Sequence, residues 1–209
     1  MYSILCHGCW TYWHFLCFFA ILGTTLSSWS AHSQTPSLVA ASAAPSAAQA
    51  GVRVPAEVQS ELPNARFIGS ARLRFFGLQV YTARLWAAPG FSRQQPMQTA
   101  FALELQYGLS LEGERIAQRS IDEMNKQGPL PPETAQRWRA FMGQTFADVN
   151  KGDRLIGLHQ PAGATKFWLN GARRGELRDP EFAQRFFDIW LSPKTSEPAM
   201  RETLLVGAP

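Results

Sequence analysis

The sequence predicts an α+β fold in which a large antiparallel sheet is covered on one face by helices. Apolar and polar residues alternate over three stretches between residues 67 and 107, and this period is typical of half-buried strands. The period becomes that of amphipathic helices between residues 110 and 146. Strand patterns resume near residue 153 and give way to helical ones after residue 179. Strands and helices segregated in this way are typical of α+β domains.

The first three strands each have an apolar face and a polar face. They are expected at residues 67–76, 78–86 and 99–107. The apolar faces are Phe67, Gly69, Ala71, Leu73 and Phe75 in the first strand, Tyr81, Ala83 and Leu85 in the second, and Phe101, Leu103, Leu105 and Tyr107 in the third. Gly77 fits a turn or bulge between the first two strands. On the polar faces we expect cross-strand pairs such as Arg84 with Glu104.

Two helices are expected next, joined by a short link into a hairpin. Ser110 is a candidate N-cap for the first helix, because its hydroxyl can accept from the first free backbone N–H groups. Gly128 and Pro129 end this helix, and Pro131 and Pro132 begin the second. The buried stripes are Ile116, Ser120, Ile121 and Met124 in the first helix and Ala135, Trp138, Met142 and Phe146 in the second.

The last third of the sequence returns to strands and ends in helices. Strands are expected at residues 153–159, 166–169 and 172–177, and Asn170-Gly171 predicts a two-residue hairpin between the last two. His159 is expected at the edge of a hairpin. Asp179 and Pro180 fit the start of a helix whose buried stripe is Phe182, Phe186, Ile189 and Trp190. A short helix is expected at residues 198–206.

The distribution of charge divides the chain into a leader, a linker and one folded domain. Residues 1–52 contain no Lys, Arg, Asp or Glu. We interpret residues 1–30 as a signal peptide or membrane anchor, because residues 13–26 form an apolar run of roughly 14 residues. Residues 31–52 are interpreted as a disordered linker of Ala, Ser and Pro, and residues 53–209 as the folded domain. This organisation predicts a periplasmic or otherwise exported protein that contacts a membrane only through its N-terminal segment.

The sequence argues against several classes of site. All three cysteines and three of the four histidines precede residue 33, so the folded domain cannot form a disulfide or a zinc site of Cys and His ligands. We therefore expect no metal and no cofactor. The basic residues are dispersed, and only residues 72–74 and 173–174 approach a cluster. A nucleic-acid surface needs a basic stripe, so we expect no nucleic-acid partner.

Three stretches together resemble the bacterial branch of the chalcone isomerase-like proteins. They are residues 67–86 (FIGSARLRFFGLQVYTARLW), residues 119–124 (RSIDEM), and residues 170–191 with Asn170-Gly171, Phe182 and the closing Ile-Trp-Leu. The resemblance extends over roughly residues 62–205. It implies an open-faced β-sandwich in which helices are layered over a large antiparallel sheet. It also implies one of two functions, since some members cyclise a chalcone to a flavanone and others bind fatty acids.

The residues at the positions of the catalytic side chains argue against the cyclisation reaction. The resemblance places the catalytic Tyr, Lys and Asn of the helix on Ile116, Arg119 and Glu123, and the catalytic Thr on Phe76. Only the positive charge is retained. Ile116 and Phe76 have no hydroxyl to stabilise a developing enolate, and loss of one such donor typically costs about 10²–10³ in rate.

Five polar residues are candidates for ligand binding: Arg72, Arg74, Tyr81, Tyr107 and Arg119. Arg72 and Arg74 lie two apart in a strand, share a face, and suit a carboxylate or phosphate. The resemblance implies that an arginine of this strand, with a tyrosine, holds the ligand head group; a solvated face is the alternative. Tyr81 and Tyr107 are either core tyrosines or polar groups that line a pocket. Arg119 is either a ligand contact or a salt-bridged surface residue.

These observations predict an exported, non-catalytic domain that binds a small amphipathic or acidic apolar molecule, such as a fatty acid. Two alternatives remain open. One is an intramolecular lyase of the chalcone isomerase type, and the other is a structural or partner-binding envelope protein without a cavity.

Overall fold

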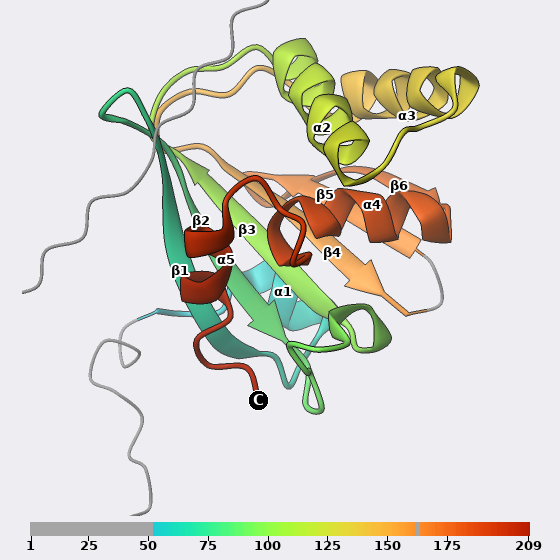
Figure 1. The fold of residues 1–209 in the computed structure, drawn as a ribbon. Helices are drawn as coiled ribbons and strands as arrows, with labels where there is room; N and C mark the ends of the chain where they lie inside the picture. The colour runs from blue at the N-terminus through green and yellow to red at the C-terminus, as the bar shows by residue number, and fades with distance from the viewer. Residues whose placement is uncertain (1–51, 162–163) are drawn as a thin grey trace, which may run out of the picture. The chain divides into compact units, whose positions relative to one another are not determined.

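The computed structural model describes residues 52–161 and 164–209, so the leader expected at residues 1–30 and all but the last residue of the expected linker lie outside the described residues. The described residues form a six-stranded antiparallel sheet in which neighbours in sequence are neighbours in space (Figure 1). The strands are β1 (Arg66–Phe75), β2 (Leu78–Ala87), β3 (Phe101–Tyr107), β4 (Arg154–Gln160), β5 (Ala164–Leu169) and β6 (Ala172–Arg178). The expected α+β fold with an antiparallel sheet is confirmed.

Four helices pack on one face of the sheet, and a fifth lies on the other (Figure 1). The four are α2 (Gly113–Gln127), α3 (Pro132–Thr145), α4 (Pro180–Leu191) and α5 (Pro198–Leu204). The fifth is α1 (Ala56–Glu61), which the sequence analysis did not predict; a short 3₁₀ helix, η2 (Pro96–Gln98), precedes β3. Val58 and Leu62 pack with Trp86 and Trp168 in a small second core on the α1 side. The sheet is therefore covered fully on one face and partly on the other.

Local sequence signals set most of the turns and helix ends. Asn170 and Gly171 have φ angles of 51° and 85°, which confirms the two-residue turn between β5 and β6. Asp179 is the N-cap of α4, where its side chain accepts from the N–H of Phe182 at 3.0 Å, and Pro180 follows at the first helical position. These signals act within a few residues of the chain, so the sequence alone reveals them.

Ser110 is not the N-cap of α2, contrary to expectation. The helix begins at Gly113, whose N–H donates to Asp148 Oδ1 at 2.9 Å, while the hydroxyl of Ser110 is bonded to Asn150 Oδ1. The reason is that Leu111 pairs with Val149 in an isolated antiparallel bridge, which keeps the chain extended past Ser110. The cap is therefore supplied by a residue distant in sequence.

The N-terminal half of β1 departs from strict alternation because it contains a bulge. Phe67 pairs with Trp86 and Gly69 with Leu85, so Ile68 is an extra residue in the strand. Ile68 enters the main core, whereas Phe67 lies on the α1 side with its ring centroid 5.3 Å from that of Trp86. The expectation that Phe67 shares a face with Ala71 is therefore wrong.

His159 also differs from expectation, because it is a buried residue of an interior strand and not a hairpin edge. It is 3% exposed in β4, which lies between β3 and β5. Its Nε2 lies 2.9 Å from the carbonyl oxygen of Met97, and its ring packs beside Phe101 and Phe187. Burial lowers the pKa of His159 from its ordinary value, although the bond to Met97 acts in the opposite sense.

The helices of the described residues bury apolar stripes in the domain core. In the part of the chain that the structure describes, no helix is both long enough and apolar enough to cross a bilayer. The predicted stripes are buried: Ile121 and Met124 of α2, Trp138 and Met142 of α3, and Phe182 of α4 pack against the sheet or one another.

Candidate functional site

A cavity of about 560 Å³ lies between the sheet and three of the helices that cover it. Its floor comes from β2 and β3, its walls from α2, α4 and α5, and its rim from the end of the β1–β2 hairpin. The apolar lining includes Leu73, Val80, Leu105, Ile116, Phe146, Leu155, Phe186, Ile189 and Met200. A hollow of this size and lining is in the range of small-molecule sites, which are mostly apolar with a few polar groups.

Tyr81 and Tyr107 lie side by side on the cavity floor. They are direct cross-strand partners at the end of the β2–β3 ladder, and their ring centroids are 6.3 Å apart. The hydroxyl of Tyr81 accepts from the indole N–H of Trp190 at 3.0 Å. The hydroxyl of Tyr107, which is 3% exposed, has no hydrogen-bond partner among the described residues. Both tyrosines pack in the main core and also line the cavity, so the two sequence-based alternatives do not exclude each other.

Burial determines the protonation of both phenols. It raises the pKa of Tyr81 to about 12, even though the bond from Trp190 acts in the opposite sense. Burial raises the pKa of Tyr107 further, and the neighbouring Tyr81 adds to the effect. Both groups are therefore neutral at physiological pH. A neutral phenol can donate a hydrogen bond to a ligand oxygen, but it is a poor general base.

Four arginines and two acids give the wall and rim of the cavity their charge: Arg74, Arg115, Arg119, Arg201, Glu123 and Glu197. Glu123 is 7% exposed and is bonded to Arg119 at 2.6 Å, to Lys126 at 2.8 Å and to Ser196 at 2.7 Å. Burial alone would raise the pKa of Glu123, but these three partners outweigh it and hold the pKa below its ordinary value. Glu123 is consequently ionised and links α2 to the segment before α5.

Arg119 is both a cavity residue and a salt-bridged surface residue. Its guanidinium pairs with Glu123 and remains 67% exposed. Arg119 is therefore a salt-bridged surface residue, as one sequence-based alternative expects, and contact with a ligand stays a prediction. A ligand anion can recruit Arg119 only in competition with Glu123.

The structure separates Arg72 from the other four candidates. Arg74 borders the cavity at the end of β1, whereas Arg72 is not one of its lining residues. Arg72 pairs across the sheet with Thr82, on the face opposite to the buried Ala71 and Ala83. Because the cavity opens at the hairpin end of the sheet, a residue two positions farther from the tip does not reach it.

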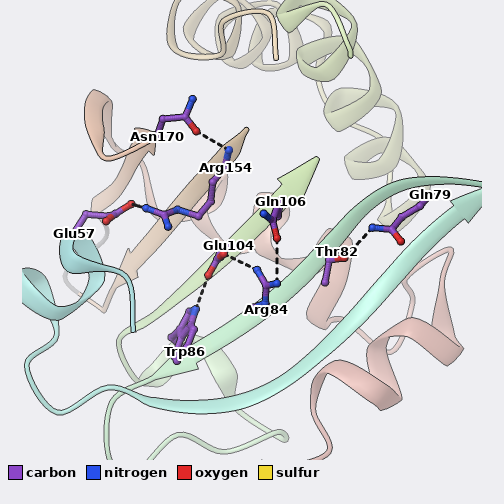
Figure 2. Close-up of polar contacts among 9 residues, drawn as sticks. All are labelled: Glu57, Gln79, Thr82, Arg84, Trp86, Glu104, Gln106, Arg154 and Asn170. Atoms are coloured by element: carbon purple, nitrogen blue, oxygen red, sulfur yellow. Dashed lines mark hydrogen bonds and ion pairs between the residues drawn. The ribbon is translucent and has the colours of Figure 1, made fainter. Parts of the chain in front are cut away.

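The opposite face of the sheet has a polar cluster whose charges pair with one another (Figure 2). Arg84 binds Glu104 at 2.7 Å, as the sequence analysis predicts, and Trp86 donates to the same carboxylate at 3.1 Å. Arg154 pairs with Glu57 of α1 at 2.6 Å. An open hollow of about 590 Å³ lies beside these pairs. Arg53 also lines this hollow, but since Arg84 and Arg154 are already paired and the lining is mostly polar, this hollow is a weaker candidate for binding an apolar ligand.

The positions that resemble catalytic residues do not form a reaction centre. Ile116 lines the cavity, but Phe76 lies at the tip of the β1–β2 hairpin and is 92% exposed. Among the residues that the structure describes, no group of three or more His, Cys, Asp or Glu residues is placed to hold a metal.

Several residues of the site were not found from the sequence. Trp190 was assigned to a buried stripe, but its indole N–H also orients Tyr81, 109 residues away in sequence. Glu123 was noted only as a replaced catalytic position, although it is the buried acid of the cavity wall. No local pattern signals either role, because each depends on the packing of α4 or α5 over the sheet.

Comparison with known proteins agrees with this architecture. No curated protein matches the sequence. The solved structures that match include a fatty-acid binding protein of Arabidopsis thaliana, AtFAP1, with a TM-score of 0.52 and 13% sequence identity over 68% of this chain and 87% of that one. At this identity the likeness shows a shared fold. The protein family described as "Chalcone isomerase-like" matches residues 46–206, most of the chain. The chain therefore belongs to the chalcone isomerase-like family.

Proposed function

We propose that this domain binds a small amphipathic molecule with a long apolar part, such as a fatty acid, and does not transform it. The observation that carries the proposal is the apolar cavity of about 560 Å³ with the unpaired hydroxyl of Tyr107 on its floor. A buried, unpaired hydroxyl destabilises a protein by about 1–3 kcal/mol. A ligand oxygen that accepts from Tyr107 removes this cost. The fold shared with a plant fatty-acid binding protein supports the same class of ligand.

The apolar lining supplies most of the expected affinity. Each buried methylene contributes about 0.8 kcal/mol, so about ten of them contribute about 8 kcal/mol before the cost of association. That cost is about 4 kcal/mol or more, so about 4 kcal/mol or less remains, and the dissociation constant is about millimolar or weaker unless polar contacts add to the affinity. The polar contacts therefore decide both the affinity and the orientation of the ligand.

Arg74 is the best-placed partner for an acidic head group. It lies at the rim, is exposed, and forms no ion pair among the described residues. A carboxylate there keeps part of its hydration, whereas a carboxylate on the floor would be buried beside two neutral phenols and the ionised Glu123. We therefore place the head group at Arg74 and the chain inside. Tyr107 then donates to an acceptor oxygen within the buried part of the ligand.

The test is displacement of a fluorescent fatty acid from the purified protein, together with mass spectrometry of organic extracts. Ile116→Trp fills the cavity from α2, whereas Gln118→Trp places the same side chain on the exposed face of that helix. We expect Ile116→Trp to weaken binding at least tenfold and Gln118→Trp to leave it unchanged. Equal effects of the two variants, or no binding by the unmodified protein, would rule out the cavity as a lipid site.

A second test asks whether the charge of Arg74 distinguishes an acidic ligand from a neutral one. Arg74→Gln should weaken binding of a fatty acid several-fold but leave binding of the corresponding fatty alcohol unchanged. Tyr107→Phe should weaken binding of a chain with an internal hydroxyl or carbonyl oxygen more than that of the plain chain. A uniform effect of either variant on all ligands would contradict the proposed orientation.

The alternative functions have less support from the site. An intramolecular lyase needs hydroxyl donors where Ile116 and Phe76 stand, and incubation with a chalcone, followed by its absorbance, tests for that reaction. A purely structural domain needs no hollow of this size.

Export also remains our proposal, based on the apolar, uncharged N-terminal segment, and fractionation of cells that express the full chain tests it.

A further inference from the structure

We propose that the tip of the β1–β2 hairpin, residues 75–78, docks on an anionic lipid bilayer and that the ligand enters the cavity from this contact. The second half of this proposal rests on the proposed function, and the first half does not. The sequence predicts membrane contact only through the N-terminal segment, so the hairpin would be a second and independent contact.

The hairpin tip exposes three large apolar side chains to solvent. Phe75, Phe76 and Leu78 are 65%, 92% and 65% exposed. The tip projects from the end of the sheet, where the other elements do not cover it (Figure 1). Elsewhere in the described residues, only Val52 and Val206 are exposed apolar side chains of comparable size. Such clustering at one projecting turn marks an interaction surface, since scattered single residues are the ordinary case.

The backbone at the tip disfavours a residue such as Phe at position 76, whose ring contacts only that of Phe75 among the aromatic rings of the described residues. Phe76 and Gly77 have φ angles of 47° and 80°, nearly those of Asn170 and Gly171 in the β5–β6 turn. Asn is the preferred residue at that first position, because a left-handed conformation costs most other residues about 1 kcal/mol or more. The same chain therefore uses Asn in one turn and an exposed aromatic ring in the other. An apolar partner outside the domain explains the ring.

The charge around the tip matches an anionic surface. Arg72 and Arg74 are exposed on β1 and form no ion pair among the described residues. No Asp or Glu occurs from residue 62 to residue 103. Aromatic and leucine side chains enter the boundary between head groups and acyl chains, and each nearby arginine adds about 1 kcal/mol of attraction to anionic lipids. These two contributions together point to a bilayer as the occupant.

The hairpin is continuous with the cavity. Arg74, Phe75 and Val80 belong to the hairpin and also line the cavity. Docking of the tip would therefore bring the cavity mouth to the depth at which the chains of membrane lipids begin. An apolar ligand could then pass between bilayer and cavity with little exposure to water.

The experiment measures hydrogen–deuterium exchange of the full chain with and without vesicles. This readout is specific to the segment, so binding through the N-terminal segment does not mask the result. We use vesicles of phosphatidylcholine that contain about one third phosphatidylglycerol, an anionic lipid. We expect these vesicles to slow amide exchange in the peptides that contain residues 73–81. The double variant Phe76→Asn with Leu78→Ser should lose this protection and keep its fold, because Asn suits the turn and neither residue lines the cavity. Val206→Ser, which removes an exposed apolar residue outside the hairpin, should behave as the unmodified chain.

Two further outcomes decide the proposal. Absence of protection at the hairpin would overturn the docking and favour a protein partner. Equal protection by vesicles of phosphatidylcholine alone, at low and high salt, would overturn the requirement for anionic lipid. The rate of transfer of a fluorescent fatty acid from vesicles to the protein tests the entry route. We expect the double variant to slow this transfer at least several-fold while its affinity for the free probe is unchanged. If the unmodified protein does not bind the free fluorescent fatty acid, the proposed function is refuted, but the result on membrane docking is unaffected.

Discussion

The two tyrosines of the cavity floor should respond to the same substitution with opposite changes in stability. Tyr81→Phe removes the acceptor of the Trp190 indole N–H, which then stays buried without a partner. Tyr107→Phe removes a buried hydroxyl that has no partner among the described residues. Each substitution deletes one oxygen atom from neighbouring positions on the same face of the sheet. The two substitutions therefore remove the same volume, and a difference between their effects on stability reports the hydrogen bonding of the two hydroxyls.

The magnitudes follow from the cost of unpaired polar groups. Tyr81→Phe loses a hydrogen bond and leaves a donor unsatisfied, which should lower the free energy of unfolding by about 1–2 kcal/mol. Tyr107→Phe relieves an unsatisfied group, but solvent in the cavity reduces the gain, so the change should lie between zero and about 1 kcal/mol of added stability. In a domain of this size a change of 1 kcal/mol shifts the melting temperature by about 2–4 °C.

Urea unfolding followed by far-ultraviolet circular dichroism measures both changes, because a shift of the midpoint at constant slope is a change in stability. The reasoning is refuted if Tyr107→Phe destabilises the protein as much as Tyr81→Phe does.

The raised pKa values of the two tyrosines allow a second test, at alkaline pH. Both folded-state pKa values are raised, so their stabilising effect is complete below pH 10 and is lost as the pH rises towards 12. The double Phe variant should therefore lose less stability over this range.

Three further predictions concern the framework of the site. Asp179→Ala should cost about 2 kcal/mol in urea unfolding, since it removes a helix cap and the partner of the Trp138 indole at 2.9 Å, and Asp179→Asn should cost about half as much. Gly69→Ala should destabilise by about 2 kcal/mol or more, because its Cβ would lie 2.4 Å from the carbonyl oxygen of Leu204; an unchanged melting temperature would show that α5 can move. The lowered pKa of His159 predicts stability that is present above about pH 6.5 and lost as the pH falls, and His159→Gln should lack this dependence.

Most of the fold could be predicted from the sequence because its signals are local. Alternation revealed β2 and β3, helical spacing revealed the stripes of α2 to α4, and Asn170-Gly171 and Asp179-Pro180 each determined a turn or a cap within four residues. Helix α1 gave no such signal. It has six residues, and its stability comes from Val58 packing against strands that follow much later in the sequence.

The candidate site was less predictable because it depends on contacts between distant segments. The sequence indicated that Tyr81 and Tyr107 share the buried face, but not that the hydroxyl of one is paired and that of the other is not. The bulge at Ile68 and the register shift between Leu73 and Arg74 add single residues to a strand, and no simple period reveals them. Consequently the sequence could not place Arg74 at the cavity and Arg72 away from it.

Three departures from local rules lie on the cavity or on the hairpin that borders it, and their position is itself an argument about function. The unpaired Tyr107 hydroxyl, the buried ionised Glu123 and the left-handed Phe76 all lie on the cavity or on the hairpin that borders it. The Asn170-Gly171 turn and the Asp179 cap, neither of which lines the cavity, follow the rules. Sequences tolerate such costs where a ligand or a surface compensates for them. Replacing Tyr107 and Phe76 together by Phe and Asn should therefore yield a more stable protein with weaker ligand uptake. A stable variant with full uptake would show that these costs serve another purpose.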